Sequence, residues 1–519
     1  MKNYLLAIDA GTGSIRAVLF DTKGKQIAMA QREWIHLEEK GVKNSMSFDF
    51  ATNWELTKTV IQEAIEGINP TQILALSATS MREGIVVYDK KGNPLWGVAN
   101  VDARASKEVK ELKKLSKNIE TKFYKTSGQT FALGALPRLL WLKKNRPQIY
   151  KKVASISMIG DFILAKLSGK IAVDPSNAGT TGIFDLKRRT WDKKMAKEMG
   201  IKPEIFPPVL ESGEILGNVT LQAAKETGLS TTTKVVMGGG DVQLGSAGLG
   251  VVNVGDGAIL GGSFWQQVVN IPHTIRPPKD MSIRVNPHVV LNQSQAEGIT
   301  FFSGLIIRWF RDAFCNDIVK KTKKKGIDPY ILLEKKAKKV PVGSYEILPI
   351  FSDAMHYGKW YHASASLLNL SIDPTKTNRY SIYRALLENT AIVSALNLKQ
   401  IEKTTDVHFK KIVFAGGASN SDLWCQIVAD ATGKTIKVPR VTEATALGAA
   451  MSAGIGVGIY KNFQDAAKKL VRFEKTYKPK KQNYKIYKQL TKKWQKAYKK
   501  QLQLVDENIT TSMWSAPGI

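Results

Sequence analysis

Short apolar segments that end in glycine-rich turns recur along this chain, and they constrain its fold more than any other feature. In the first, YLLAIDAGTGSIRAVLFD at residues 4–21, two strand-like segments flank the turn GTGS. Only a tight turn fits between them, so we predict a β-hairpin and not a strand–helix–strand unit. Similar turns follow DGAIL at residues 256–260 and KIVFA at residues 411–415. Elsewhere strand-like runs alternate with helical periodicity, which predicts an α/β fold.

The length of the chain favours two domains. A chain of 519 residues exceeds what one hydrophobic core usually supports. At residues 248–260 the composition shifts to glycine, valine and aspartate, and we place the boundary there. We predict an N-terminal domain at residues 1–252 and a C-terminal domain at residues 253–460. Lysine-rich residues 461–519 are expected to form a helical extension packed on the rest, since aromatic side chains recur there at helical spacing.

The net charge of +31 raises the question of an anionic partner. Such an excess can indicate nucleic acid or a membrane surface, but lysine runs such as KKTKKKG are also typical of solvated faces, which we favour. We therefore expect no nucleic-acid partner and no membrane association. The two cysteines, Cys315 and Cys425, cannot build a disulfide framework, and Asp9 interrupts the apolar start of the chain. These features predict a cytoplasmic protein.

The glycine turns stand on both sides of the predicted domain boundary. Backbone N–H groups in such turns can cradle phosphates, so we interpret the turns as a nucleotide site in a cleft between two related domains. Two common nucleotide motifs are absent. The segment ATGKT at residues 431–435 has Val428 where a P-loop needs glycine, and no G-x-G-x-x-G joins a strand to a helix. Each turn alone could still be a plain hairpin turn.

The segment VVMGGGDVQLG places a lone carboxylate, Asp241, directly after three glycines. Because glycine has no side chain, we expect the backbone here to leave room for a bound group. An Asx turn or a helix cap is the alternative role for Asp241, since both are common for an aspartate after glycine.

Taken together, these motifs resemble the FGGY family of carbohydrate kinases, members of the sugar kinase, Hsp70 and actin superfamily. The resemblance rests on DAGTGSIRAVLFD, GGGDVQLG, GGSF, FAGGASNSD and EATALGAA, which span nearly the whole chain. It implies two actin-like (ribonuclease H-like) α/β domains that flank a nucleotide cleft, with ATP and Mg²⁺ as cofactors. Phosphoryl transfer passes through a charge-rich transition state, so such an enzyme mainly positions groups and neutralises charge.

For the nucleotide, the resemblance assigns contacts to the three turns. The first turn would bind the β- and γ-phosphates, and Asp9 would face the phosphate-bound magnesium through water. The residues implied near the phosphates are Gly11, Thr12, Gly13, Ser14, Arg16, Gly261, Gly262 and Ser263, and those implied at the base and ribose are Gly416, Gly417, Ala418 and Asn420. Asn420 could equally be a helix-start residue. EATALGAA is expected to be structural, because alanine and glycine allow close helix packing.

For the acceptor alcohol, the resemblance makes Asp241 the catalytic base and an acceptor-binding residue. An alcohol has a pKa of about 16, so a carboxylate cannot remove its proton in advance, but it can accept the proton as the new bond forms. Arg82 and Glu83 resemble the family's substrate-hydroxyl pair, although without the resemblance an exposed ion pair would be preferred. Asp102, with Arg104, is expected to join them.

Two positions depart from the family's pattern. Asn100 stands where the family usually has tryptophan, and Phe131 or Leu133 stands where related glycerol kinases place a substrate-binding tyrosine. The second change argues against glycerol as the acceptor. It fits an acceptor with fewer hydroxyl groups, for which a more apolar wall is expected.

Further segments, among them SMREGIVVYD, AVDPSNAGTTG, RVNPHV and the terminal TTSMWSAPGI, resemble one branch of the family. That branch phosphorylates the quorum-sensing signal autoinducer-2, taken as the open-chain (S)-4,5-dihydroxypentane-2,3-dione, at its terminal 5-hydroxyl. The branch also implies docking by a phosphocarrier protein of the sugar phosphotransferase system. The alternatives are a pentulokinase acting on xylulose or ribulose, and an actin- or Hsp70-like ATP switch or nucleic-acid-binding protein. The sequence leaves the oligomeric state open.

Overall fold

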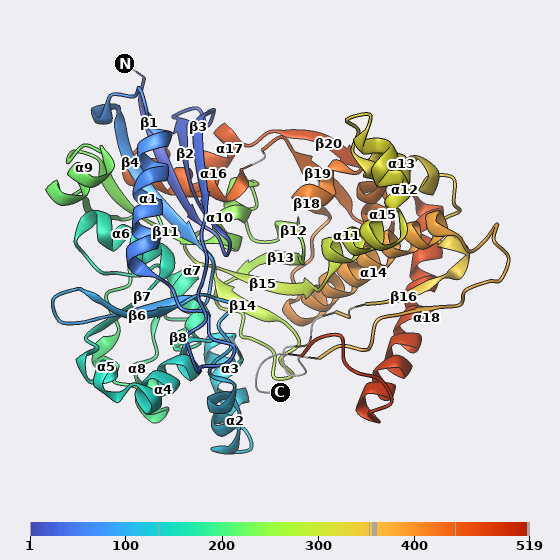
Figure 1. The fold of residues 1–519 in the computed structure, drawn as a ribbon, viewed down its shortest axis with the longest axis horizontal. Helices are drawn as coiled ribbons and strands as arrows, with labels where there is room; N and C mark the ends of the chain where they lie inside the picture. Colours follow the sequence, from blue (N-terminus) through green and yellow to red (C-terminus); the bar gives the residue numbers. More distant parts are fainter. Residues whose placement is uncertain are drawn as a thin grey trace.

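The structure, a computed structural model, contains two large β-sheets with helices on and between them (Figure 1). It describes residues 2–132, 134–351, 353–354, 356, 361–441 and 443–515. Leu133 and the last four residues of the terminal segment, both named above, lie outside the described residues. Within the described ranges, no helix is both long and apolar enough to cross a membrane.

The first sheet begins with the predicted hairpin. β1 and β2 pair antiparallel, with Tyr4 opposite Asp21 and Ala10 opposite Ile15, and β4 lies parallel to β1 on its other side. The strand order is β10-β11-β4-β1-β2-β3. The strands are β1 (Tyr4–Ala10), β2 (Ser14–Asp21), β3 (Gln26–Glu33), β4 (Ile73–Ser80), β10 (Ile215–Asn218) and β11 (Lys234–Gly240).

The second sheet repeats this arrangement. β12 pairs antiparallel with β13 across the second glycine turn and parallel with β18 on its other side. The strand order is β14-β15-β13-β12-β18-β19-β20. The strands are β12 (Gly257–Gly261), β13 (Trp265–Pro272), β14 (Arg284–Pro287), β15 (Gln293–Thr300), β18 (Lys411–Ala415), β19 (Thr435–Pro439) and β20 (Phe473–Tyr477). Antiparallel strands joined to parallel ones in both sheets confirm the expectation of two related α/β domains.

Helices cover both faces of the first sheet, as the alternation of side chains along β1 requires. Leu6 and Ile8 point to a core with α1, α6 and α9, whereas Leu5 and Ala7 point to a core with α10, α16 and α17. The helices are α1 (Phe50–Ala64), α6 (Ile159–Ser168), α9 (Leu221–Thr227), α10 (Asp241–Gly248), α16 (Ala444–Gly456) and α17 (Phe463–Leu470).

Helices α10 and α16 lie between the two sheets (Figure 1). Leu244 of α10 packs with the first sheet, and Val242 packs with strands of the second. A Cβ atom on Gly448 would stand 1.9 Å from the Leu244 carbonyl oxygen, and one on Gly248 would stand 1.9 Å from that of Ala444. The two helices can therefore touch only because of these glycines, as expected for EATALGAA.

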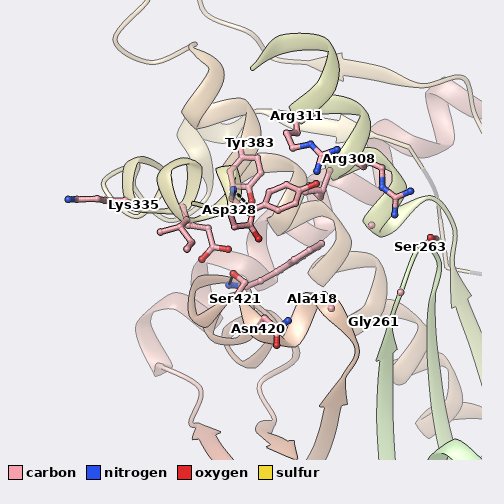
Figure 2. A pocket seen from close by; sticks show the side chains of 18 of the residues that line it. Gly261, Ser263, Arg308, Arg311, Asp328, Lys335, Tyr383, Ala418, Asn420 and Ser421 are labelled. Carbon is pink, nitrogen blue, oxygen red and sulfur yellow. Dashed lines mark hydrogen bonds between the residues drawn. The ribbon is translucent and has the colours of Figure 1, made fainter. Parts of the chain in front are cut away.

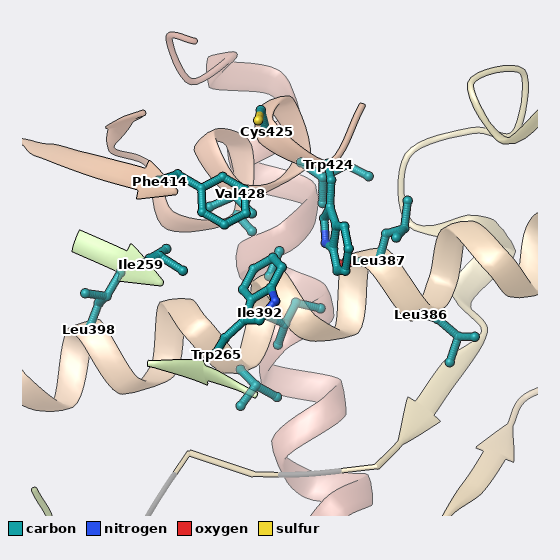
Figure 3. Close-up of a cluster of buried hydrophobic side chains, with 14 of the residues drawn as sticks. Ile259, Trp265, Leu386, Leu387, Ile392, Leu398, Phe414, Trp424, Cys425 and Val428 are labelled. Carbon is teal, nitrogen blue, oxygen red and sulfur yellow. The ribbon is translucent and has the colours of Figure 1, made fainter. Parts of the chain in front are cut away.

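The second sheet packs on the long helix α14 (Arg379–Thr405) and on α15 (Asp422–Thr432) (Figure 3). At the centre of this core, the ring of Trp265 lies 4.9 Å from that of Phe414 and 4.7 Å from that of Trp424. Helix α15 is capped by Ser421, whose side chain accepts from the Trp424 N–H, and it ends at Gly433 with φ +68°.

The lysine-rich tail forms α18 (Lys481–Asp506), which packs its aromatic stripe into the same core. Tyr487, Leu490, Trp494 and Tyr498 are buried, whereas Tyr484 is 38% exposed. β20 belongs to the same tail and forms the edge of the second sheet next to β19. The predicted division at residues 252 and 460 remains a proposal.

The remaining elements surround these two cores. Around the first domain lie β5 (Ile85–Tyr88), β6 (Pro94–Val98), β7 (Ser155–Met158), β8 (Phe184–Asp185), β9 (Thr190–Trp191), α2 (Ser106–Lys114), α3 (Ile119–Ser127), α4 (Ala135–Asn145), α5 (Pro147–Lys152), α7 (Pro175–Ala178), α8 (Lys193–Glu198), η1 (Pro70–Gln72), η2 (Gly179–Thr181) and η3 (Pro203–Ile205). Around the second lie α11 (Ser303–Phe314), α12 (Asn316–Lys323), α13 (Pro329–Ala337), β16 (Leu348–Ile350), β17 (Ser366–Leu368), η4 (Ser344–Glu346) and η5 (Gly417–Asn420).

Candidate active site

Two of the three glycines before Asp241 are required by packing within the protein. They end β11, and a Cβ atom on Gly238 would lie 1.7 Å from the Ala78 carbonyl oxygen. One on Gly239 would lie 2.6 Å from Val289 Cγ1. The expectation that this bare backbone leaves room for a bound group is therefore wrong for these two glycines, because β4 and Val289 already fill the space.

Asp241 is the first residue of α10 and lies next to Arg82. Its Oδ1 atom accepts from the Val242 N–H at 2.8 Å, and the Gly240 N–H donates to Ser176 Oγ at 2.9 Å. Burial raises the pKa of the Asp241 carboxyl to about 7; the Arg82 guanidinium opposes this, and the Glu83 and Asp9 carboxylates add to it. The side chain is still 37% exposed. A carboxylate with this pKa and access to the cleft suits a general base.

Arg82 and Glu83 reach from the end of β4 to a pair of opposed residues in the second sheet. Arg82 donates both Nη atoms to the Glu297 carboxylate, at 2.6 and 2.9 Å. The Glu83 carboxylate pairs with the guanidinium of Arg284. Arg284 lies directly opposite Glu297 across β14 and β15. Four charges thus form two ion pairs between the halves of the molecule, and the Arg82 Nε atom lies 3.7 Å from Asp241 Oδ1.

The electrostatics of these two pairs favour the charged forms of Glu83 and Arg82. Burial alone would raise the pKa of Glu83, but the guanidinium groups of Arg284 and Arg82 outweigh it and lower that pKa. Burial likewise disfavours the Arg82 cation, and the Glu297 carboxylate more than compensates, so the pKa of Arg82 is raised. Arg82 is a buried ion-pair member and Glu83 is partly buried; the exposed ion pair preferred without the resemblance is wrong for Arg82, which is 5% exposed.

Arg138 is a further residue near the site, which sequence reasoning did not identify. Its guanidinium donates to the backbone carbonyls of Glu83, Asn100 and Asp102. Glu83 has a φ of +65°, a conformation that L-residues seldom adopt. The buried clamp of Arg138 holds this strained backbone, and with it the direction of the Glu83 side chain.

A cavity of about 250 Å³ lies beside these ion pairs, and we call it the acceptor cavity. Its lining combines polar side chains with an aromatic part and comprises Arg82, Glu83, Asn100, Gln129, Thr130, Ala132, Gly134, Thr180, Phe264, Gln266, Arg284, Ile299, Phe301 and Trp514. Asn100 also donates to the Thr12 hydroxyl at 3.0 Å, so it links this cavity to the first glycine turn. Phe131 is fully buried against Phe123 and is not part of the lining.

The structure does not bring Asp102 to this cavity. Its side chain is fully buried, and its Oδ2 atom accepts from the Met46 N–H at 2.6 Å and from Arg104 Nε at 2.8 Å. Arg104 also pairs with Glu39. The charged groups of Asp102 and Arg104 therefore pair within the protein and stabilise the structure around the cavity.

The first glycine turn is fixed through its carbonyl groups. The indole N–H of Trp34 donates to the Gly11 carbonyl at 2.9 Å, and the His36 ring contacts the Thr12 carbonyl at 2.8 Å. The Trp34 N–H donates to the Gly13 carbonyl at 3.2 Å. A Cβ atom on Gly13 would meet nothing within 4 Å, so the outer side of this turn is open. Ser14 begins β2 at the end of the turn.

Arg16 lies at the base of this turn and bridges two acids. It donates to Asp9 Oδ2 and to Glu443 Oε2, both at 2.8 Å. Glu443 precedes α16, so the bridge connects the first sheet to the helix between the sheets. A cavity of about 300 Å³ adjoins it, lined in part by Arg16, Gly245, Gly261, Gly262, Gly416 and Glu443.

Asp9 was expected to face magnesium. Burial raises the pKa of the Asp9 carboxyl, and Arg16 offsets this only in part, so a nearby cation would favour its ionised form. Among the described residues there is no group of three or more His, Cys, Asp or Glu side chains that could hold a metal ion. This donor set fits an ion held by a single carboxylate and completed by phosphate oxygens and water, the mode common for Mg²⁺.

A larger cavity of about 960 Å³ lies in the second half of the molecule, and we call it the nucleotide cavity (Figure 2). It is open and lined by glycine turns, by aromatic rings and by cations at its edge. From the predicted residues the lining contains Gly261, Gly262, Ser263, Gly417, Ala418 and Asn420, and it adds Arg308, Arg311, Lys335, Lys338, Tyr330, Tyr383 and Trp424. The sequence offered no signal for the cations, because lysine and arginine are spread over the whole surface.

The second and third glycine turns touch each other at this cavity. Gly416 has a φ of +96°, and a Cβ atom on it would lie 2.6 Å from the Gly261 carbonyl oxygen. Gly417, by contrast, has nothing within 4 Å of such an atom. Asn420 is exposed at the end of η5, and the capping role falls to Ser421. The structure thus places Asn420 in the cavity wall and not in the cap.

Comparison with known proteins accounts for this arrangement. The models for the N-terminal and C-terminal domains of the FGGY family of carbohydrate kinases match residues 4–248 and 278–457. The chain belongs to the FGGY family of carbohydrate kinases. Two relatives are autoinducer-2 kinases, from Klebsiella pneumoniae and Yersinia enterocolitica. Each is 52% identical to this FGGY kinase over 520 residues, covering 100% of this chain and 98% of the relative.

Solved structures share the fold of this FGGY kinase at low sequence identity. Gluconate kinase from Lactobacillus acidophilus superposes with a TM-score of 0.84 at 20% identity, covering 96% of this chain and 98% of its own. Xylulose kinase from Rhodospirillum rubrum also gives 0.84, at 22% identity and with 96% and 99% covered. These matches confirm the two actin-like domains, and they say nothing further about the acceptor.

Proposed function

We propose that this FGGY kinase transfers the γ-phosphoryl group of ATP to the terminal 5-hydroxyl of open-chain (S)-4,5-dihydroxypentane-2,3-dione, giving phospho-autoinducer-2. The position of Asp241 carries the proposal. Asp241 lies 3.7 Å from Arg82, which lines the acceptor cavity, and it begins the helix whose Gly245 lines the cavity beside the glycine turns. The curated relatives described above supply the identity of the acceptor.

In this proposal, Asp241 orients the acceptor hydroxyl and takes its proton. The hydroxyl oxygen forms a bond to the γ-phosphorus while the bond from that phosphorus to the bridging oxygen of the diphosphate breaks. ADP leaves with the bonding electrons, and the proton moves to the carboxylate. A base placed in this way typically contributes about 100- to 10,000-fold to the rate. Arg82, paired with Glu297, lies 3.7 Å from Asp241, and its charge favours the ionised form of that carboxyl.

The glycine turns bind the donor. Gly11, Thr12, Gly13 and Ser14 offer N–H and hydroxyl groups to the β- and γ-phosphates, with Gly261, Gly262 and Ser263 on the opposite side. Gly416, Gly417, Ala418 and Asn420 contact the base and ribose. Asp9 would hold Mg²⁺, which would supply positive charge to neutralise the phosphates. Arg16 orients Asp9, and its bridge to Glu443 connects this end of the site to α16.

Glu83 and Arg284 bind hydroxyl or carbonyl oxygens of the acceptor, and Asp102 supports the cavity from behind. We further propose a cytoplasmic location, for which the two buried free cysteines are the support. Docking by a phosphocarrier protein remains a proposal drawn from the resemblance alone.

The test is a side-by-side assay of ATP-dependent phosphorylation of dihydroxypentanedione, xylulose, ribulose and glycerol. We expect the dione to give the highest kcat/KM, and Asp241→Asn to lower kcat by at least about 100-fold. Asp406→Asn is the matched control, because this residue is 98% exposed and far from the site in sequence. A preference for a ketose would reject the acceptor, ATP hydrolysis without any acceptor would favour a switch protein, and full activity of Asp241→Asn would reject the base.

A further inference from the structure

The segment after α18 returns to the active site. The N–H groups of Ile509 and Thr510 both donate to the Leu504 carbonyl, at 2.8 and 3.1 Å, so the chain reverses at the end of the helix. Figure 1 shows the chain beyond α18 running back towards β14, in the middle of the molecule. Residues 510–515, the described part of the terminal segment that resembles one branch of the family, therefore have a defined place in the fold.

Main-chain contacts fix Trp514 within this segment. The His362 N–H donates to the Trp514 carbonyl at 3.1 Å, and Ser515 forms an isolated antiparallel bridge with Tyr361. The indole ring stacks on Phe301, with ring centroids 4.6 Å apart and planes inclined by 29°. Phe301 in turn meets the edge of Phe264 at 5.7 Å. Trp514 is thus one face of an aromatic wall, and it also lines the acceptor cavity.

The lining of the acceptor cavity consequently has two unlike parts. One part is Arg82, next to Asp241, where the reacting hydroxyl would lie. The other part is Phe301 and Trp514, which offer an aromatic surface. Dihydroxypentanedione has a matching asymmetry, because its hydroxyls are at carbons 4 and 5 and its other end is a methyl ketone. A ketopentose has a hydroxymethyl group in place of that methyl group.

We propose that Trp514 is a specificity-determining residue, which packs with Phe301 against the methyl-ketone end of the acceptor. The identity of the acceptor rests on the function proposed above. A hydroxyl buried against this wall loses its hydrogen bonds to water. An apolar pocket rejects an added hydroxyl by roughly 100-fold, whereas removal of the wall lets water solvate the hydroxyl again. The wall therefore favours the dione over xylulose and ribulose.

The test compares Trp514→Ala, Trp514→Phe and Ile509→Ala in the full chain. Ile509 is the matched control, because it lies in the same segment and is 65% exposed. For Trp514→Ala we expect a KM for the dione at least about 10-fold higher, and a ratio of kcat/KM for dione over ketopentose about 10- to 100-fold lower. The KM for ATP stays within about 2-fold. Trp514→Phe keeps most of the preference, and Ile509→Ala keeps all of it.

Calorimetric binding of the dione, without turnover, separates this proposal from the proposed function. If wild type binds the dione at least about 10-fold more tightly than Trp514→Ala, the wall is supported even if the reaction differs. Equal binding by the two proteins overturns the wall, as does an equal effect of Ile509→Ala. A wild-type preference for a ketopentose in the kinetic assay overturns the proposed function instead. Thermal unfolding of each variant checks that the fold is retained.

Discussion

The acceptor cavity and the nucleotide cavity differ in what they are made of. The first encloses about 250 Å³ between charges that are buried and paired across the two halves of the molecule, as in Arg82 with Glu297. The second encloses about 960 Å³ between glycine turns, with cations at its open edge. Buried polar groups discriminate strongly between ligands, because a wrong ligand leaves them unpaired. Open backbone turns tolerate the loss of a single ligand contact. We therefore expect substitutions at the acceptor cavity to have the larger effects.

Glu297→Gln is the strongest test of this difference between the two cavities. The substitution keeps the size of a side chain that is fully buried, but it leaves the Arg82 cation without its main partner. Removal of one member of a buried ion pair typically costs about 3–5 kcal/mol of stability. Because Arg82 also orients Asp241, we expect kcat/KM for the acceptor to fall by about 100-fold or more. Chemical denaturation and steady-state kinetics measure the two effects.

The matched control is Glu346→Gln. Glu346 pairs with Lys493, and the two side chains are 60% and 55% exposed. An exposed pair is worth about 0–1 kcal/mol, so stability and activity stay close to wild type. If both glutamine variants behave alike, the ion pairs across the cleft do not support the acceptor cavity, and the contrast between the cavities fails.

The pH dependence of activity sharpens the comparison, because the proposed base, Asp241, lies next to the acceptor cavity. The pKa of Asp241 is raised to about 7 by burial, and catalysis needs the ionised form. We expect kcat/KM, measured with both substrates below their KM, to be constant above pH 7 and to fall about 10-fold per unit below it. An inflection near pH 4 would contradict this assignment.

The contribution of Asp241 to folding stability should change with pH in the opposite direction to kcat/KM. The folded pKa of Asp241 lies above its ordinary value of 3.8, so the native state binds more protons than the unfolded state between these two values. This carboxyl therefore contributes stability at low pH that is lost as the pH rises through about 7. Asparagine at position 241 does not ionise, so Asp241→Asn does not lose this stability as the pH rises. We expect the melting temperature of the variant to exceed that of wild type at pH 8 and to approach it at pH 4.

Local features of the chain were predictable from its sequence. The hairpin at β1 and β2, the cap at Ser421 and the end of α15 at Gly433 each depend on residues a few positions apart. The acid at the end of a glycine run, Asp241, was also a strong local signal. The packing reason for Gly238 was not available, because it depends on the Ala78 carbonyl of a strand far away in the sequence.

The partners of the site residues could not be predicted. Glu297 is 215 positions from Arg82, and it is selected only because β15 places it opposite Arg284 in the register of the second sheet. The position of Trp514 beside the acceptor cavity depends on the chain reversal after α18 and on the ring contact with Phe301. Such contacts follow from how segments far apart in the sequence pack together, which no spacing within one segment encodes.

The smallest expected effect lies in the nucleotide cavity, at Asn420. Its side chain is exposed in the cavity wall, and the adjacent Ser421 caps α15 by accepting from the Trp424 N–H at 3.0 Å. Asn420→Ala should therefore raise the KM for ATP by a few-fold and leave stability unchanged. Ser421→Ala should instead lower stability by about 1 kcal/mol, the usual value of a lost N-cap.

Asn420→Ala and Ser421→Ala separate an effect on ATP binding from an effect on folding at neighbouring positions. ATP titrations and denaturation curves of both variants measure the two quantities. If Asn420→Ala destabilises the protein and Ser421→Ala does not, the capping role belongs to Asn420. A loss of ATP affinity at Asn420 as large as the loss of acceptor activity in Glu297→Gln would show that the nucleotide cavity is as demanding as the acceptor cavity, despite its open glycine turns.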